Sequence, residues 1–128
     1  MKKLIAMMAL GLTVGLAVGV SAPAGAHDSP AQHGGIVKTA GDISFELVNK
    51  DGKTTIYVAD HGKAVPMAGA SGTLTVLKGG NKTELPLSAG AGNTLVAAGD
   101  VKLDSGAKAV AFITFPDKAQ MSVRFSVK

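Results

Sequence analysis

Apolar and polar residues alternate in several short stretches of the chain, which is the pattern of half-buried β-strands. The clearest stretch is 120–127, in which Met121, Val123, Phe125 and Val127 alternate with polar residues. Similar stretches predict further strands at 43–49, 53–59, 72–78, 82–88, 94–98 and 108–115. Outside the apolar N-terminal leader, no window of a dozen residues has the helical period. The pattern therefore predicts strands and no helix.

Turn residues separate these stretches and indicate how they connect. Asp51-Gly52 lies between two alternating stretches, and this dipeptide favours a tight hairpin because both residues tolerate a positive φ. Pro86 has no N–H, which predicts that the strand at 82–88 lies at the edge of a sheet. Six to eight short strands in one domain at 35–128 predict an all-β fold. The expected architecture is a small antiparallel β-sandwich, immunoglobulin-like, or a small barrel.

The first 26 residues match a secretory signal peptide. Lys2 and Lys3 precede an apolar run, and small residues with two possible cleavage sites, after Ala24 or after Ala26, follow it. An uncleaved membrane anchor is the alternative, but no charged residue stops the run. We favour cleavage after Ala26, which predicts a free periplasmic protein without a membrane anchor. Residues 27–34 are then expected to form a flexible N-terminal arm.

Composition excludes several classes of function. Loss of Lys2 and Lys3 lowers the basic count from 13 to 11 against 9 acidic residues, so the net charge falls from +4 to +2. The basic residues are scattered and aromatic residues make up 4% of the chain, which argues against a nucleic-acid partner. The chain has no cysteine, so neither a disulfide nor a cysteine nucleophile is available. No serine lies in a nucleophile elbow, and we expect no enzyme activity.

The three histidines carry the most specific chemistry in the sequence. Imidazole is the commonest protein ligand for copper, zinc, nickel and cobalt. His33 and His61 both adjoin turn-like segments, which predicts that they meet and bind one metal ion. Asp60 is a candidate ligand, an acceptor that orients His61, or a residue that only caps a turn. Met67 offers a thioether that suits Cu(I), although a methionine in this position is more often core filler.

His27 becomes the first residue of the mature chain if cleavage follows Ala26. Its α-amine and its imidazole could then chelate one Cu(II) or Ni(II) ion, with Asp28 nearby as an oxygen donor. The alternative is that His27 belongs to a solvated arm and binds nothing. Copper is the favoured metal, and zinc, nickel or cobalt are the other candidates.

Three motifs in order, "QHGGIV", "ISFELV" and "IYVADHGKAVPM", carry a resemblance to a known module. The chain resembles the metal-binding N-terminal domain of adaptor subunits in heavy-metal efflux pumps of the resistance-nodulation-division class, and small standalone periplasmic proteins of metal resistance. The resemblance implies a β-domain that binds a transition metal through His33 and His61, with Asp60 beside the latter, and that passes it to a pump component. The adaptors' long helical hairpin and lipoyl-like segments have no counterpart here.

These observations predict a periplasmic transition-metal-binding protein that acts as a chaperone, buffer or sensor in metal tolerance or efflux. The competing interpretation is a metal-free immunoglobulin-like domain that presents a sheet edge or loops to a protein partner. Replacement of all three histidines separates the two, because only the first function requires them.

Overall fold

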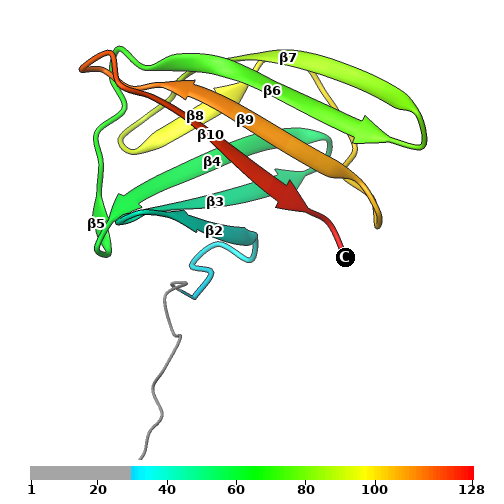
Figure 1. Ribbon diagram of the computed structural model, residues 1–128, viewed down its shortest axis with the longest axis horizontal. Coiled ribbons are helices and arrows are strands. Elements are labelled where there is room, and N and C mark those ends of the chain that lie inside the picture. Colours follow the sequence, from blue (N-terminus) through cyan, green and yellow to red (C-terminus); the bar gives the residue numbers. More distant parts are fainter. Residues whose placement is uncertain (1–29) are drawn as a thin grey trace, which may run out of the picture.

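The computed structural model describes residues 30–128, which form an all-β fold without a helix (Figure 1). One antiparallel sheet has the strand order β10-β9-β6-β7-β8-β4-β3-β2, and β5 pairs with β4. The strands are β2 (Ile36–Ala40), β3 (Ile43–Lys50), β4 (Lys53–Asp60), β5 (Lys63–Ala64), β6 (Ser71–Lys78), β7 (Asn81–Ala89), β8 (Thr94–Ala97), β9 (Lys108–Thr114) and β10 (Gln120–Ser126). In this part of the chain no helix could span a membrane. The predicted signal peptide and His27 lie outside the described residues.

The sheet curls until its two end strands, β2 and β10, approach each other without forming a ladder. The all-β prediction is confirmed, and the architecture is a nearly closed small barrel. Its interior is filled by the inward-facing residues of all the long strands. The largest fully buried side chains are Phe45, Phe125, Leu47, Ile56, Met67, Leu74, Leu95, Ile113, Val58 and Thr54. We call the gap between β2 and β10 the seam (Figure 1).

The hairpin predicted at Asp51-Gly52 is present. Asp51 has a φ of 54° and Gly52 a φ of 83°, and Lys50 pairs with Lys53 across the turn. This register places Glu46 opposite Tyr57 on the outer face of the barrel, because Phe45 and Leu47 point into the core. The tight turn thus determines which two side chains meet on the surface.

The edge position predicted for the strand that contains Pro86 is wrong, because β7 lies between β6 and β8. The Pro86 carbonyl accepts a hydrogen bond from the N–H of Ala98 at 2.9 Å. In an extended strand the nitrogen of a residue faces the same side as its carbonyl, so the missing N–H also faces β8. The ladder between β7 and β8 begins only at Leu87, opposite Ala97. Proline is tolerated here because the neighbouring strand has ended.

Two strands were not expected from the sequence, β2 and β5. In β2, Lys38 pairs with Phe45, so its side chain lies on the core side of the sheet and interrupts the apolar alternation. Lys38 is nevertheless exposed, because β2 borders the seam.

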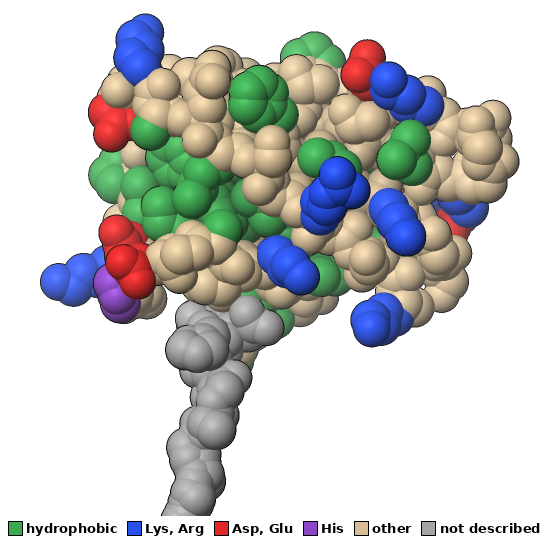
Figure 2. All heavy atoms as spheres, in the orientation of Figure 1, with side chains coloured by type: hydrophobic (Ala, Val, Ile, Leu, Met, Phe, Trp, Pro, Cys, Tyr) green, Lys and Arg blue, Asp and Glu red, His purple; other side chains and the backbone are tan. Residues whose placement is uncertain are grey.

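Apolar side chains also reach the surface of the molecule seen in this orientation (Figure 2). Lys and Arg side chains are spread over that face and do not gather at one place.

Candidate functional site

The carboxylate of Glu46 binds the segment that precedes β2. Glu46 Oε1 accepts hydrogen bonds from the backbone N–H of Gln32 at 3.0 Å and from Nδ1 of His33 at 2.9 Å. Glu46 Oε2 accepts from the backbone N–H of His33 and of Gly35, both at 2.8 Å. Four donors thus converge on one side chain, and we call this arrangement the Glu46 clasp. It ties the described part of the predicted N-terminal arm to β3.

The clasp changes the acidity of Glu46. Burial raises the pKa of this carboxyl, but hydrogen bonds from the His33 side chain and from the N–H groups of Gly35, His33 and Gln32 lower it by more. The result is a pKa lowered from 4.5 to about 2. Glu46 is therefore ionised at neutral pH and can only accept hydrogen bonds. Since an ionised carboxylate cannot donate, His33 Nδ1 must carry the proton that they share.

Two glycines allow the chain to approach Glu46 so closely. Gly34 has a φ of 75°, in the left-handed region that favours glycine. A Cβ on Gly35 would lie 2.3 Å from the carbonyl oxygen of Leu47, which no side chain could tolerate. The sequence His33-Gly34-Gly35 is therefore explained by the backbone geometry of the clasp.

The imidazole of His33 lies flat against the ring of Tyr57. The ring centroids are 3.6 Å apart and the planes differ by 5°. The stack fixes the plane of the imidazole, and the bond from Nδ1 to Glu46 fixes its rotation within that plane. Within residues 30–128, Nε2 of His33 has no hydrogen-bond or ion-pair partner. The ring therefore combines a defined orientation with one unengaged nitrogen.

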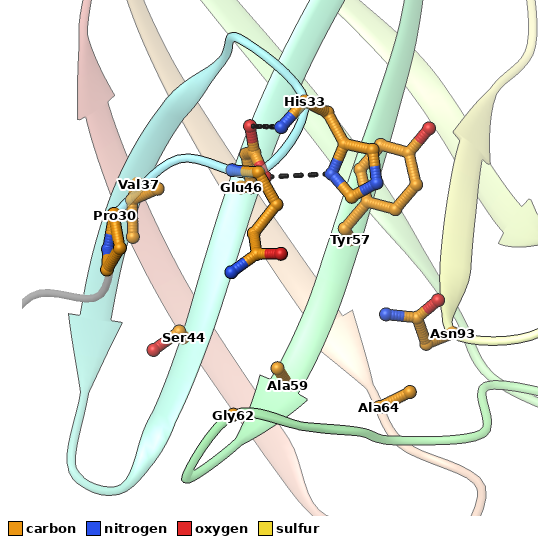
Figure 3. A pocket seen from close by; sticks show the side chains of 11 residues that line it. Pro30, His33, Val37, Ser44, Glu46, Tyr57, Ala59, Gly62, Ala64 and Asn93 are labelled. Atoms are coloured by element: carbon orange, nitrogen blue, oxygen red, sulfur yellow. Dashed lines mark hydrogen bonds and ion pairs between the residues drawn. The ribbon is translucent and has the colours of Figure 1, made fainter.

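A groove begins at this histidine and runs along the outer face of β3 and β4. Its volume is about 440 Å³, which lies in the range of about 300–1,000 Å³ usual for small-ligand pockets. Figure 3 shows His33, Glu46 and Tyr57 together at one end and Gly62 and Ala64 at the other. The lining is completed by Pro30, Gln32, Val37, Ser44, Ala59 and Asn93. Asn93 is held in place because its side-chain amide donates to the carbonyl of Val58 at 2.9 Å.

His61 lies in a different setting, at the turn between β4 and β5. Its Nδ1 is 2.6 Å from Oδ1 of Asp60, and its Nε2 is 3.4 Å from Oδ1 of Asp42. The backbone N–H of His61 also donates to the carbonyl of Asp42 at 3.2 Å. All three side chains are at least half exposed. Both ring nitrogens of His61 therefore face carboxylates, and the histidine links the β2–β3 turn to the β4–β5 turn.

The structure does not bring His33 and His61 together. His33 stacks on Tyr57, and His61 follows Tyr57 by four residues, so the Cα atoms of Tyr57 and His61 are roughly 13 Å apart at the usual rise of a strand. Two nitrogen ligands of one ion lie within about 4 Å of each other, because each bond is about 2.0–2.1 Å long. Within residues 30–128, no three His, Asp or Glu side chains are placed to hold a metal ion.

The remaining candidate ligands divide between the core and the undescribed N-terminus. Met67 is fully buried, and its sulfur would reach a metal only if the core opened. It packs in the same cluster as Phe45 and Val58, as the alternative interpretation of core filler predicted. His27 lies outside the described residues, so its part in metal binding stays a prediction.

Glu46 and Tyr57 are the two residues that the sequence reasoning missed. The signal for them was present, because a two-residue turn at Asp51-Gly52 places positions 46 and 57 opposite each other. What the sequence did not indicate is that the chain before β2 folds back over them. That contact depends on hydrogen bonds between backbone N–H groups and one carboxylate, which leave no periodic pattern.

Comparison with known proteins adds no relative. No protein-family model matches the chain, and neither a curated protein nor a solved structure matches it significantly. The resemblance to metal-efflux adaptor domains therefore stays a prediction that rests on the three quoted motifs alone.

Proposed function

We propose that this chain is a periplasmic transition-metal-binding protein in which Nε2 of His33 is a ligand. One observation carries the proposal: a buried carboxylate, Glu46, engages Nδ1 of His33 while Nε2 has no partner within the described residues. Metal-binding histidines are commonly held in this way, because the carboxylate fixes the tautomer and orients the ring. Copper is the favoured metal, with zinc, nickel and cobalt as alternatives.

A single imidazole binds metal weakly, so further ligands are needed. The mature N-terminus is the nearest source in the sequence, since His27 precedes Pro30 by three residues and Pro30 lines the groove. Three residues span at most about 11 Å, so the chain length allows His27 to supply its α-amine and imidazole to a metal at the groove. Water or a group from a partner protein completes the coordination. The biological role that fits is a chaperone, buffer or sensor that exchanges metal with a periplasmic component of an efflux pump.

Metal titration with matched histidine variants tests the proposal. We expect His33→Ala to weaken Cu(II) binding at least about tenfold, or about 1.4 kcal/mol. His61→Ala is the control, because both nitrogens of His61 already face carboxylates and its side chain does not line the groove. Affinity should also fall as the pH drops below neutrality, since protons compete for imidazole nitrogens. Elemental analysis of the exported protein identifies the metal that it carries.

Equal affinity in His33→Ala and the parent contradicts the proposal. Equal weakening by the two variants would instead indicate a shared site, for which the β4–β5 turn would have to move toward His33.

The role of the processed terminus is tested by proteins that differ only at residue 26. A protein that begins at His27 has a free α-amine beside the imidazole, whereas one that keeps Ala26 has an amide nitrogen there. We expect the shorter protein to bind Cu(II) more tightly, with a smaller difference for Cu(I), which favours softer ligands. Mass spectrometry of the exported protein establishes whether His27 is its first residue. Equal Cu(II) affinity of both forms would remove His27 from the site.

The competing function is a metal-free interaction domain, and the edge of β10 at the seam, which pairs with no further strand within residues 30–128, favours it. Exposed strand edges can pair with an extended segment of another protein. A variant with all three histidines replaced separates the two functions. Retained biological activity of that variant would support the interaction domain.

A further inference from the structure

The Glu46 clasp joins two structural roles in one side chain. Through Oε2 and Oε1 it holds three backbone N–H groups of residues 32–35, and through Oε1 it also holds the ring of His33. The side chain is 6% exposed, so water does not compete freely for these bonds. The chain segment and the imidazole are therefore fixed by the same carboxylate.

The identity of the acceptor determines the tautomer of His33. A neutral imidazole has one N–H and one lone pair, and either nitrogen can carry the proton. A carboxylate can only accept, which places the proton on Nδ1 and leaves the lone pair on Nε2. The stack on Tyr57 does not discriminate between tautomers, because both present the same ring face. Among the described residues, the hydrogen bond from Nδ1 to Glu46 is therefore the contact that selects the tautomer.

We infer that Glu46 is a positioning residue that fixes His33 in the Nδ1–H tautomer and thereby prepares Nε2 to donate its lone pair. The use of that lone pair on a metal rests on the proposed function, but the tautomer itself does not. The same carboxylate links the ring to the N-terminal arm. A metal bound to Nε2 favours the arrangement in which Nδ1 is bonded to Glu46, and the same carboxylate holds the backbone of residues 32–35. Metal binding and docking of this segment consequently stabilise each other, because coupling between two binding events is reciprocal.

Nitrogen-15 spectra of the metal-free exported protein test the tautomer directly. At a pH of about 8, where unperturbed imidazoles are neutral, the two ring nitrogens of His33 report which of them is protonated. We expect protonated Nδ1 in the parent protein. In Glu46→Gln we expect a shift toward the tautomer mixture of a solvent-exposed histidine, because an amide can both donate and accept. Glu84→Gln is the matched control, since Glu84 is an exposed carboxylate on β7 far along the sheet from β3.

A second variant separates the effect on the tautomer from a general loosening of the site. Tyr57→Leu removes the stack and leaves the carboxylate, so His33 should keep protonated Nδ1. Cu(II) binding should weaken by about ten- to a hundredfold in Glu46→Gln, the range seen when such supporting carboxylates are lost. It should be unchanged in Glu84→Gln.

The outcomes distinguish this inference from the proposed function. The same tautomer distribution in the parent and in Glu46→Gln overturns the positioning role. A parent with protonated Nδ1 whose His33 signals do not respond to Zn(II), and whose Cu(II) affinity survives His33→Ala, overturns the metal site. In that case the tautomer shift in Glu46→Gln still supports Glu46 as the residue that positions His33.

Discussion

Glu46 stands on the outer face of β3, where the alternation of the strand correctly places a polar side chain. That pattern predicts an exposed carboxylate, yet the side chain is almost completely covered by residues 32–35. The cover depends on Gly35 lying close to the backbone of Leu47. This approach is possible only because glycine has no side chain. The hydrophobic pattern of a sequence shows which side chains are apolar. It does not show which carboxylate accepts hydrogen bonds from a distant backbone segment.

The lowered pKa of Glu46 predicts a specific dependence of stability on pH. Its pKa is about 2 in the folded protein against 4.5 for an unperturbed carboxyl, so the ionised form stabilises the fold at pH values above 4.5. The stabilisation is about 3 kcal/mol, and it is lost as the pH falls from about 4.5 through about 2. We expect about 2 kcal/mol of it to be gone near pH 3.

Urea unfolding of the parent and of Glu46→Gln, at neutral pH and near pH 3, measures this contribution. The parent should lose more free energy of unfolding than the variant over that interval, because the variant has no carboxyl to protonate at position 46. Glu84→Gln should follow the parent. Parallel pH profiles for the parent and Glu46→Gln would contradict the lowered pKa.

Among the elements, the hairpins were predictable and the positions of the strands in the sheet were not. Asp51-Gly52 encodes its own turn and the register of β3 on β4, both of which are local. The neighbours of β7 are set by the packing of distant segments, so Pro86 alone could not show that β8 ends beside it. β2 was missed because Lys38 occupies an inward position that only an edge strand at the seam can accommodate.

The alternation in β10 predicts the effect of truncating one core side chain. Phe125 is 1% exposed and pairs with Ala109 of β9, so Phe125→Ala should lower the free energy of unfolding by about 3–5 kcal/mol. Its neighbour Arg124 is exposed, and Arg124→Ala should change stability by no more than about 0.5 kcal/mol. Chemical denaturation measures both. A loss below about 1 kcal/mol for Phe125→Ala would mean that β10 does not cover the core in solution.

At the scale of the whole molecule, the sequence predicted the all-β class and left the architecture open between a sandwich and a barrel. The choice depends on contacts between β2 and β10, which lie at opposite ends of the described chain. The candidate site has the same origin, since it needs the segment before β2, the centre of β3 and the centre of β4. His33 could be singled out from its residue type. Its separation from His61 followed only from the fold.

The seam also bears on how this protein behaves at high concentration. An unpaired strand edge is a template on which another chain can add a strand, and repeated addition leads to aggregates. Lys38 lies on the inward side of β2 at that edge, where a strand from a second molecule would have to bury its ammonium group. Burial of an unpaired charge is strongly unfavourable. We therefore expect the lysine that obscures β2 in the sequence to disfavour addition of a strand from a second molecule at this edge.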